Sequence, residues 1–273
     1  MKKFLSVLLA LGLAVSATAC AGGASSSSEA ASSEPEATPA AESEAATSEA
    51  AAATGEVMTY DEYMAAAVDE AVTIESCVQA KQSYYAEQGT ATVYLQDESG
   101  AYFAYDMACT QEEYDQMTEG TRIRVSGYKA EWSGEVEIMD GQLDEILEGD
   151  TYVAEPLDVT ELLGTDELES HQNEKVKFTG LTVAPSTIEG DTTEYAFLYN
   201  YDGSGTQGDD VYFNVEYNGE VYQFLVESYL CDSSTDVYKA VEALEIGQTI
   251  DCEGFLYWYE GVNPHITSVT VNG

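Results

Sequence analysis

Histidine and cysteine most often carry catalysis and transition-metal binding, and the chain has only two histidines and five cysteines. His171 lies in a polar stretch, and His265 follows Pro264 at the start of an alternating segment. The sequence contains no histidine pair at zinc-binding spacing, no Cys-x-x-Cys pair and no serine in the setting of a nucleophile elbow. We therefore expect no catalytic residue and predict that the chain is not an enzyme.

Oxygen-bearing side chains recur at alternate positions between Asn200 and Asp210, as they do in calcium-binding loops. Counted from Asp202, however, position six is Gln207 and position twelve is Phe213, where an EF-hand has glycine and glutamate. The first interpretation is a flexible acidic loop without a cofactor. The alternative is a calcium site formed by Asp202, Asp209 and Asp210.

Aromatic residues form two groups that could contact a ligand. Tyr195, Phe197, Tyr199 and Tyr201 alternate, which in an extended strand places all four rings on one face. The second group is Tyr257-Trp258-Tyr259, and Trp132 stands at the corresponding place in the first half of the chain. Such rings either stack on a ligand or fill a seam between domains. The predicted ligand-binding residues are Tyr257, Trp258, Tyr259, Trp132, Tyr199 and Tyr201.

An internal repeat indicates how these residues are positioned. Residues 72–80 align with residues 176–184, and residues 120–127 align with residues 247–254. Each copy predicts a short helix, a strand, a hairpin, a second helix and two closing strands. Residues 166–172 are the second copy's counterpart of the first helix, and a change of face at Ser76 or Gly180 predicts a bulge in the first strand. Helix-capping patterns occur at Thr59 with Glu62 and at Thr110 with Glu113, and the hairpin of the second copy turns at Asn218-Gly219.

This element order resembles the OB-fold, a five-stranded, partly open barrel. The fold class expected is mainly β with short helices (α+β), as two tandem OB-like five-stranded barrels over 56–150 and 151–273. The second barrel has an inserted loop near 185–209. The loops that hold the two aromatic groups flank the ligand face of oligosaccharide- or oligonucleotide-binding OB-folds. The whole chain also resembles uncharacterised OB-fold lipoproteins of gut clostridia, a likeness that implies no particular activity.

The repeat assigns two of the cysteines to core positions. Cys77 aligns with Leu181, and Cys252 aligns with Val125, so both are expected to be buried free thiols. Cys109 and Cys231 each precede a predicted helix. A structural disulfide is the alternative, with three pairings open to four cysteines.

The first twenty residues predict export. Lys2 and Lys3 precede an apolar stretch from Phe4 to Val15, and small residues end at Ala19. The next residue, Cys20, makes this region resemble a bacterial lipoprotein signal, although Ala17 stands where leucine is usual. We predict a signal peptide over 1–19, a diacylated Cys20 with a disordered tether over 20–55, and a location on the outer face of the cell membrane. The alternative is a freely secreted protein.

The charge of the chain narrows the partners that we expect. The sequence has 51 acidic and 9 basic residues, and only six of the acids lie in the tether. Proteins that bind nucleic acid neutralise phosphates with clustered lysine and arginine, so we expect no nucleic-acid partner. The expected partners are the membrane through Cys20 and a saccharide, a peptide or an envelope protein. The predicted function is a non-catalytic extracytoplasmic binding module, with an assembly lipoprotein or a calcium-stabilised domain as alternatives.

Overall fold

The structure is a computed structural model that describes residues 55–272. The predicted signal peptide, Cys20 and nearly all of the tether lie outside the described residues. Within them, no helix is long and apolar enough to cross a membrane.

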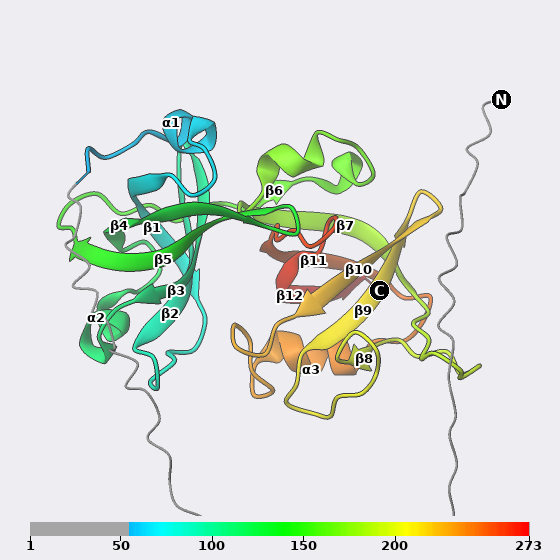
Figure 1. Cartoon of the computed structure of the whole chain (residues 1–273). Coiled ribbons are helices and arrows are strands. Elements are labelled where there is room, and N and C mark those ends of the chain that lie inside the picture. Colours follow the sequence, from blue (N-terminus) through cyan, green and yellow to red (C-terminus); the bar gives the residue numbers. More distant parts are fainter. Residues whose placement is uncertain (1–54, 273) are drawn as a thin grey trace, which may run out of the picture. The chain divides into compact units, whose positions relative to one another are not determined.

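The first barrel closes with its strands in the order β1-β2-β3-β5-β4, and β1 pairs with both β2 and β4. All its strand pairs are antiparallel except β3 with β5, which is parallel. A short helix, α1, precedes β1, and α2 connects β3 to β4 (Figure 1). The elements are α1 Tyr60–Ala65, β1 Ala71–Lys81, β2 Thr90–Asp97, β3 Gly100–Ala108, α2 Gln111–Gln116, β4 Arg122–Trp132 and β5 Glu135–Ile146.

The second barrel has the same topology. Its five long strands follow the order β7-β11-β12-β10-β9, and an additional pairing of β7 with β9 closes the ring. The short strands β6 and β8 pair with β7 and β9. The elements are β6 Leu157–Asp158, η1 Thr160–Leu162, η2 Leu168–His171, β7 Lys175–Ala184, β8 Leu198–Tyr199, β9 Val211–Tyr217, β10 Glu220–Val226, α3 Asp236–Glu242, β11 Thr249–Phe255 and β12 His265–Asn272. Two closed five-stranded barrels of OB-fold topology confirm the predicted fold class.

The internal repeat coincides with equivalent strands of the two barrels. Its first match becomes β1 and β7, and its second becomes β4 and β11. The bulge predicted at Gly180 is present, because the register of β7 against β11 shifts there and Gly180 has φ +68°. The bulge predicted at Ser76 is wrong. The pairing of β1 with β4 runs without a break from Ala71 to Cys77, and the extra residue against β2 is Gln79.

Both predicted helix caps and the predicted hairpin turn are confirmed. Thr59 and Glu62 exchange the reciprocal hydrogen bonds of a capping box, and so do Thr110 and Glu113. Asn218 and Gly219 both have positive φ, as the tight turn between β9 and β10 requires. The stretch predicted as a helix after Asp166 forms only the short 3₁₀ turn η2.

Each barrel encloses its own apolar core. Cys252 lies in the core of the second barrel, as the repeat predicts. Cys77 is also fully buried, but on the outside of its barrel, because Val72, Ile74 and Val78 take the inward positions of β1. Among the described residues, Cys77, Cys109, Cys231 and Cys252 are all free thiols.

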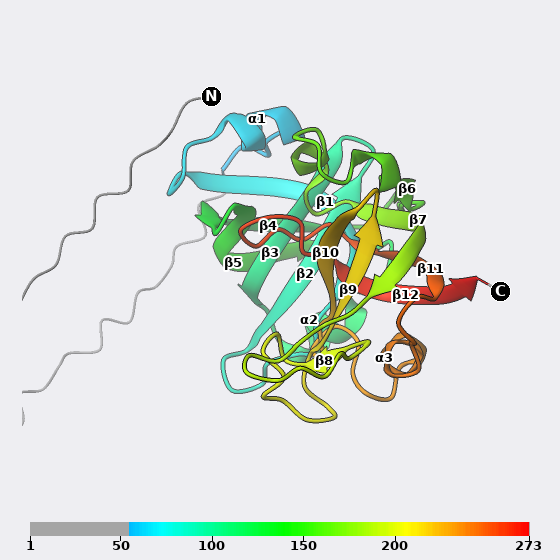
Figure 2. The same cartoon turned by 90° about the vertical axis from the view of Figure 1, so that its right-hand side faces the viewer.

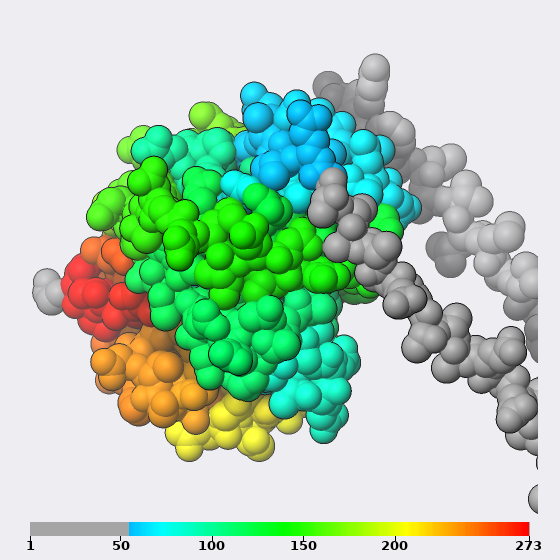
Figure 3. Space-filling view, turned by 90° about the vertical axis from the view of Figure 1, so that its left-hand side faces the viewer, coloured from blue at the N-terminus to red at the C-terminus, as the bar shows by residue number. Residues whose placement is uncertain are grey.

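The two barrels lie side by side, and β2 and β3 of the first belong to the side that faces the second (Figures 1 and 2). Figure 3 shows another face of the first barrel, where the segment that contains α1, in blue, lies above β4 and β5, in green. The outer face of β2 and β3 therefore carries the residues from which a site between the barrels can be built.

Candidate functional site

The seam between the barrels is built from outward-facing aromatic side chains. In β2, Ala91, Val93 and Leu95 face the barrel core, so Tyr94 faces outward. Tyr94 is nevertheless fully buried, since its ring stacks on Phe255 of the second barrel with centroids 4.4 Å apart. These contacts, together with Phe103 of β3, form a small apolar cluster that joins the two barrels.

Polar contacts join the same faces. The Ser83 backbone N–H donates to the Tyr229 carbonyl at 2.8 Å. The Lys175 backbone N–H donates to Gln96 Oε1 at 2.8 Å. A backbone N–H of each barrel thus donates a hydrogen bond to the other barrel. Because each bond needs its particular partner, the two barrels pack in one defined arrangement.

A cleft of about 980 Å³ opens beside this seam. The first barrel lines it with Tyr84, Tyr85, Phe103 and Tyr105. The second barrel lines it with Tyr201, Tyr212, Tyr229, Tyr257 and Tyr259. Nine aromatic side chains from two barrels thus face one space. The acidic residues on its walls are Asp106, Asp210 and Glu227, and no described lysine or arginine contributes to the walls.

Asp210 and Glu227 face one another because of the strand register. Asp210 directly precedes β9 and Glu227 directly follows β10, and the last pair between these strands is Val211 with Val226. Asp210 Oδ1 accepts hydrogen bonds from the N–H and the hydroxyl of Ser228, both at 2.8 Å. Glu227 Oε2 accepts one from Gln82 Nε2 at 2.8 Å. We refer to Asp210 and Glu227 as the carboxyl pair.

The surroundings of the carboxyl pair raise the pKa values of Glu227 and of the neighbouring Tyr212. Burial, together with the neighbouring Asp210, raises the pKa of Glu227 to about 8. Burial, with Asp210 and Glu227 nearby, also raises the pKa of Tyr212 to about 12. At neutral pH, Glu227 is therefore mostly protonated, and the Tyr212 hydroxyl keeps its proton.

His265 also lines the cleft, at the start of β12. Its Nδ1 lies 2.6 Å from Tyr94 Oη, and its ring stacks on Tyr257 with centroids 4.4 Å apart. Complete burial lowers the pKa of His265 to about 3. This histidine is therefore neutral across the physiological range and serves as a packed structural group.

The cleft gathers three of the six residues predicted to bind a ligand, Tyr201, Tyr257 and Tyr259. Trp132 is 59% exposed at the end of β4 and does not line the cleft. Tyr199 packs against the core of the second barrel and donates its hydroxyl to Glu242 Oε1 at 2.6 Å. The alternation from Tyr195 to Tyr201 does not form one strand face, because only Leu198–Tyr199 are extended as a strand.

Trp258 holds the barrels together outside the cleft. Its backbone N–H donates to Glu135 Oε2 at 2.8 Å, across the seam. Its ring packs against the second core and over Gly134, where a Cβ would lie 2.8 Å from Trp258 Cδ1. The stacking role predicted for Trp258 gains no support from this position.

The three aspartates of the calcium alternative do not converge. Asp202 accepts from the Ser204 N–H at 3.0 Å and Asp209 from the Thr206 N–H at 2.8 Å, each within its own turn. Asp210 belongs to the carboxyl pair. The part of the chain that the structure describes holds no group of three or more side chains suited to a metal ion.

The sequence analysis missed the contribution of the first barrel. Phe103 and Tyr105 alternate along β3 with the buried core residues Tyr102 and Ala104. Large aromatic residues at both outward positions of a strand indicate a covered or ligand-binding face. Tyr212 on β9 carries the same signal, since Val211 and Phe213 on either side of it point into the core.

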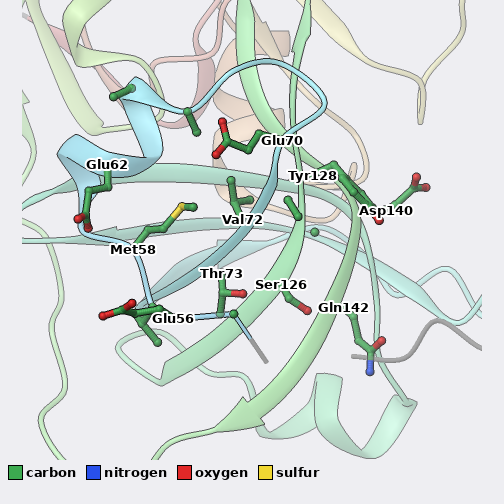
Figure 4. Close-up of a pocket in the computed structure, with 16 residues that line it drawn as sticks. Glu56, Met58, Glu62, Glu70, Val72, Thr73, Ser126, Tyr128, Asp140 and Gln142 are labelled. Atoms are coloured by element: carbon green, nitrogen blue, oxygen red, sulfur yellow. The ribbon is translucent and has the colours of Figure 1, made fainter. Parts of the chain in front are cut away.

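A second hollow of about 560 Å³ lies beside α1, β1 and β4 of the first barrel. Figure 4 shows Glu56, Glu62 and Glu70 around it, together with Tyr128 and Asp140. It forms where residues 55–58 cross β1, and none of the predicted site residues lines it.

No protein-family model matches the chain, and no curated protein sequence matches it. Solved structures do match its fold. A murine DNA-binding protein bound to double-stranded DNA is 12% identical with a TM-score of 0.34, over 74% of this chain and 96% of that one. The Ifi202 HINa domain in complex with 20-bp double-stranded DNA is 12% identical with a TM-score of 0.31, over 75% and 96%. The single-stranded DNA-binding protein from Thermus aquaticus is 15% identical with a TM-score of 0.24, over 76% and 95%.

These structures share the OB-fold, and they correct the partner prediction. That prediction named the membrane and a saccharide, a peptide or an envelope protein as partners. It also excluded nucleic acid. Solved structures that match the chain include proteins bound to DNA, so the exclusion is withdrawn. At this level of similarity the comparison identifies no ligand for this chain. The ligand is inferred below from the cleft itself.

Proposed function

We propose that this chain is a non-catalytic binding protein whose ligand enters the cleft between the two barrels. One observation carries the proposal: nine aromatic side chains from both barrels face one space of about 980 Å³. This volume lies at the upper end of the range for small-molecule sites, which are apolar clefts with a few placed polar groups. Sites of this kind occur preferentially at the interfaces between domains.

The chemistry of the walls supports binding without a reaction. Tyrosine offers an apolar ring for stacking and a hydroxyl that can donate to a ligand at the same time. The one histidine of the cleft bonds to Tyr94 and does not titrate near neutral pH. Cys231 lies near the carboxyl pair, and burial raises its pKa to about 11, which keeps the thiol protonated and unreactive.

The proposed location follows the N-terminal signal. Cys20 after a short apolar leader is the basis for placing the protein outside the cytoplasm, lipid-anchored to the outer face of a bacterial cell membrane. A cleft between two barrels on a tether would then meet ligands from outside the cell.

Saturation-transfer NMR on the whole chain in detergent tests the function. The probes are a panel of neutral and charged small molecules: monosaccharides, amino acids, nucleosides and amines. We expect at least one class to bind, and Tyr212→Ala and Tyr259→Ala to weaken it at least tenfold. Trp132→Ala removes an exposed ring outside the cleft and is the matched control. Binding of no class, or binding indifferent to both tyrosine variants, would overturn the proposal.

A further inference from the structure

We infer that the ligand of this cleft is a small organic cation, bound with its ammonium group between the carboxyl pair and the ring of Tyr212. The inference rests on the proposed function and names the class of its ligand. It depends on the charges of the cleft, the free oxygen of Asp210, the rings at and beside Tyr212 and the size of the space.

The side chains of the cleft that can become charged by pH 8 are all acids. Its walls carry Asp106, Asp210 and Glu227 and no described lysine or arginine. The four ion pairs of the described residues lie elsewhere, at Arg124, His171 and Lys175. The carboxyl pair therefore lacks a counter-charge from the protein. Carboxylates without a counter-charge attract a cation strongly once water is displaced.

Asp210 keeps one carboxylate oxygen for a ligand. The two hydrogen bonds from Ser228 both end on Asp210 Oδ1, and among the described residues none ends on Asp210 Oδ2. Glu227 accepts from Gln82 Nε2 and also has the Leu230 backbone N–H beside its carboxyl group. A cationic group with hydrogen-bond donors or a diffuse positive charge satisfies the free oxygen of Asp210 without rearranging the protein.

Tyr212 lies beside the carboxyl pair, and Tyr201 and Tyr259 lie beside Tyr212. Tyr201 and Tyr212 meet edge to face with centroids 6.4 Å apart. Tyr259 and both acids of the carboxyl pair lie close enough to Tyr212 to raise the pKa of its hydroxyl. Ring faces attract ammonium groups, and rings grouped around carboxylates form the cages that recognise quaternary ammonium ligands.

The size of the cleft favours an organic cation over a metal ion. Calcium needs six to eight oxygen ligands at short range, and the described residues contain no group of three ligating side chains. A space of about 980 Å³ accommodates an ammonium group together with the carbon skeleton attached to it. Phe103, Tyr105 and Tyr257 supply the apolar wall for that skeleton.

Cation binding should depend on pH through Glu227. The groups that face Glu227 are Asp210 and Tyr212 at β9, Tyr94 and Tyr105 of the first barrel, Gln82, Tyr257 and Cys231. The pKa values of these tyrosines and of Cys231 are raised by burial, so they keep their protons below pH 9. Glu227, with a pKa of about 8, must lose its proton to pair with a cation. Affinity should therefore rise by up to about tenfold per pH unit between pH 6 and 8.

Isothermal titration of the whole chain in detergent tests this class. The probes are choline and spermidine, compared with 3,3-dimethyl-1-butanol, a neutral molecule of the same shape as choline. We expect at least one cation to bind ten times more tightly than the neutral molecule at pH 8. Glu227→Gln keeps the side-chain shape but removes the charge, and should cost at least tenfold and abolish the pH dependence. Trp132→Ala should change neither.

Two results would overturn the inference: no preference for either cation, or full cation affinity in Glu227→Gln with an unchanged unfolding midpoint. If the cations fail while a neutral compound of the NMR panel binds in a Tyr212-dependent way, the ligand class is wrong and the proposed function stands. If no compound of any class binds, both are wrong. A pH dependence that persists in Glu227→Gln would place the titrating group at Glu135 or Glu137, whose pKa values burial also raises, and would overturn the role of Glu227.

Discussion

Tyr94 of the first barrel and His265 of the second share a buried hydrogen bond, with Tyr94 Oη 2.6 Å from His265 Nδ1. Both side chains are almost completely buried, and their other contacts are aromatic rings from both barrels. The bond therefore lies at the centre of the seam, where water cannot replace either partner.

Removing one partner of this bond should weaken the seam. Tyr94→Phe keeps the ring stacking on Phe255 but leaves the imidazole nitrogen unsatisfied, which costs about 1–3 kcal/mol. Urea unfolding at pH 7 measures the change. The control is Tyr128→Phe, which removes a hydroxyl from a half-exposed ring. Equal stability of the two variants would mean that the bond contributes nothing to folding.

Three carboxyls near the seam, the buried Glu135 and Glu137 and the partly buried Glu227, should make stability fall as pH rises. Burial raises the pKa of Glu135 to about 8, of Glu137 to about 7 and of Glu227 to about 8. In the unfolded chain these groups lose their protons near pH 4.5. Between pH 5 and 8 the folded state therefore holds more protons, and its stability declines by at most about 1.4 kcal/mol per group and pH unit.

Urea midpoints at pH 5, 6, 7 and 8 test this decline. Glu135→Gln should flatten the pH profile, since Glu135 has no exposed surface. The exposed Glu161→Gln should leave the profile as it is. A midpoint that rises with pH over this window contradicts the expected burial of these acids.

Strand pattern and capping residues predict each barrel well, because both are local. Thr110 and Glu113 fix the start of α2, and Asn218-Gly219 fixes the turn between β9 and β10. The bulge of β1 was misplaced, since Ser76 and Gln79 are both polar residues in a buried strand. What distinguishes Gln79 includes hydrogen bonds to the distant residues Tyr152 and Ala154, which a strand pattern does not show.

The cleft could be predicted only in part, because it depends on how the barrels dock. Tyr257 and Tyr259 stand in a loop already known to flank ligands in this fold, and their sequence position is enough to select them. Trp258 between them points instead toward Gly134 of the other barrel. The pairing of Asp210 with Glu227 follows from the register of β9 and β10, which the hairpin at Asn218-Gly219 sets.

Substitution of Trp258 should lower stability without affecting binding, and substitution of Tyr259 should do the opposite. Trp258→Ala removes a ring packed against the second core and should cost about 2–4 kcal/mol. Tyr259 is 51% exposed, so Tyr259→Ala should change stability by less than about 0.5 kcal/mol. In titrations with choline, Tyr259→Ala should lose affinity and Trp258→Ala should retain it. The reverse pattern would return the stacking role to Trp258.

Cys20 should decide where the protein is found. If it carries the lipid, Cys20→Ser should move the protein from the membrane fraction to the soluble extracytoplasmic fraction. Two acyl chains make anchoring stable, whereas the Cys20→Ser variant has no site for them. Fractionation with labelled palmitate measures both effects, and Cys109→Ser is the control. Unlabelled wild-type protein in the soluble fraction would favour free secretion.

Gln79, the extra residue in β1, should be among the most sensitive positions of the first barrel. Its Nε2 lies 3.0–3.2 Å from the carbonyl oxygens of Cys77, Gln96 and Tyr152, and its Oε1 accepts from the Ala154 N–H at 2.8 Å. The side chain thus ties the segment between the barrels to the outside of β1. Gln79→Ala leaves these buried backbone groups without partners, and should cost about 2–4 kcal/mol. The exposed Gln88→Ala should cost nearly nothing.

Because the segment at residues 152–154 leads into the second barrel, limited proteolysis of Gln79→Ala should cut there first. Protection equal to that of Gln88→Ala would show that the seam alone holds the segment in place.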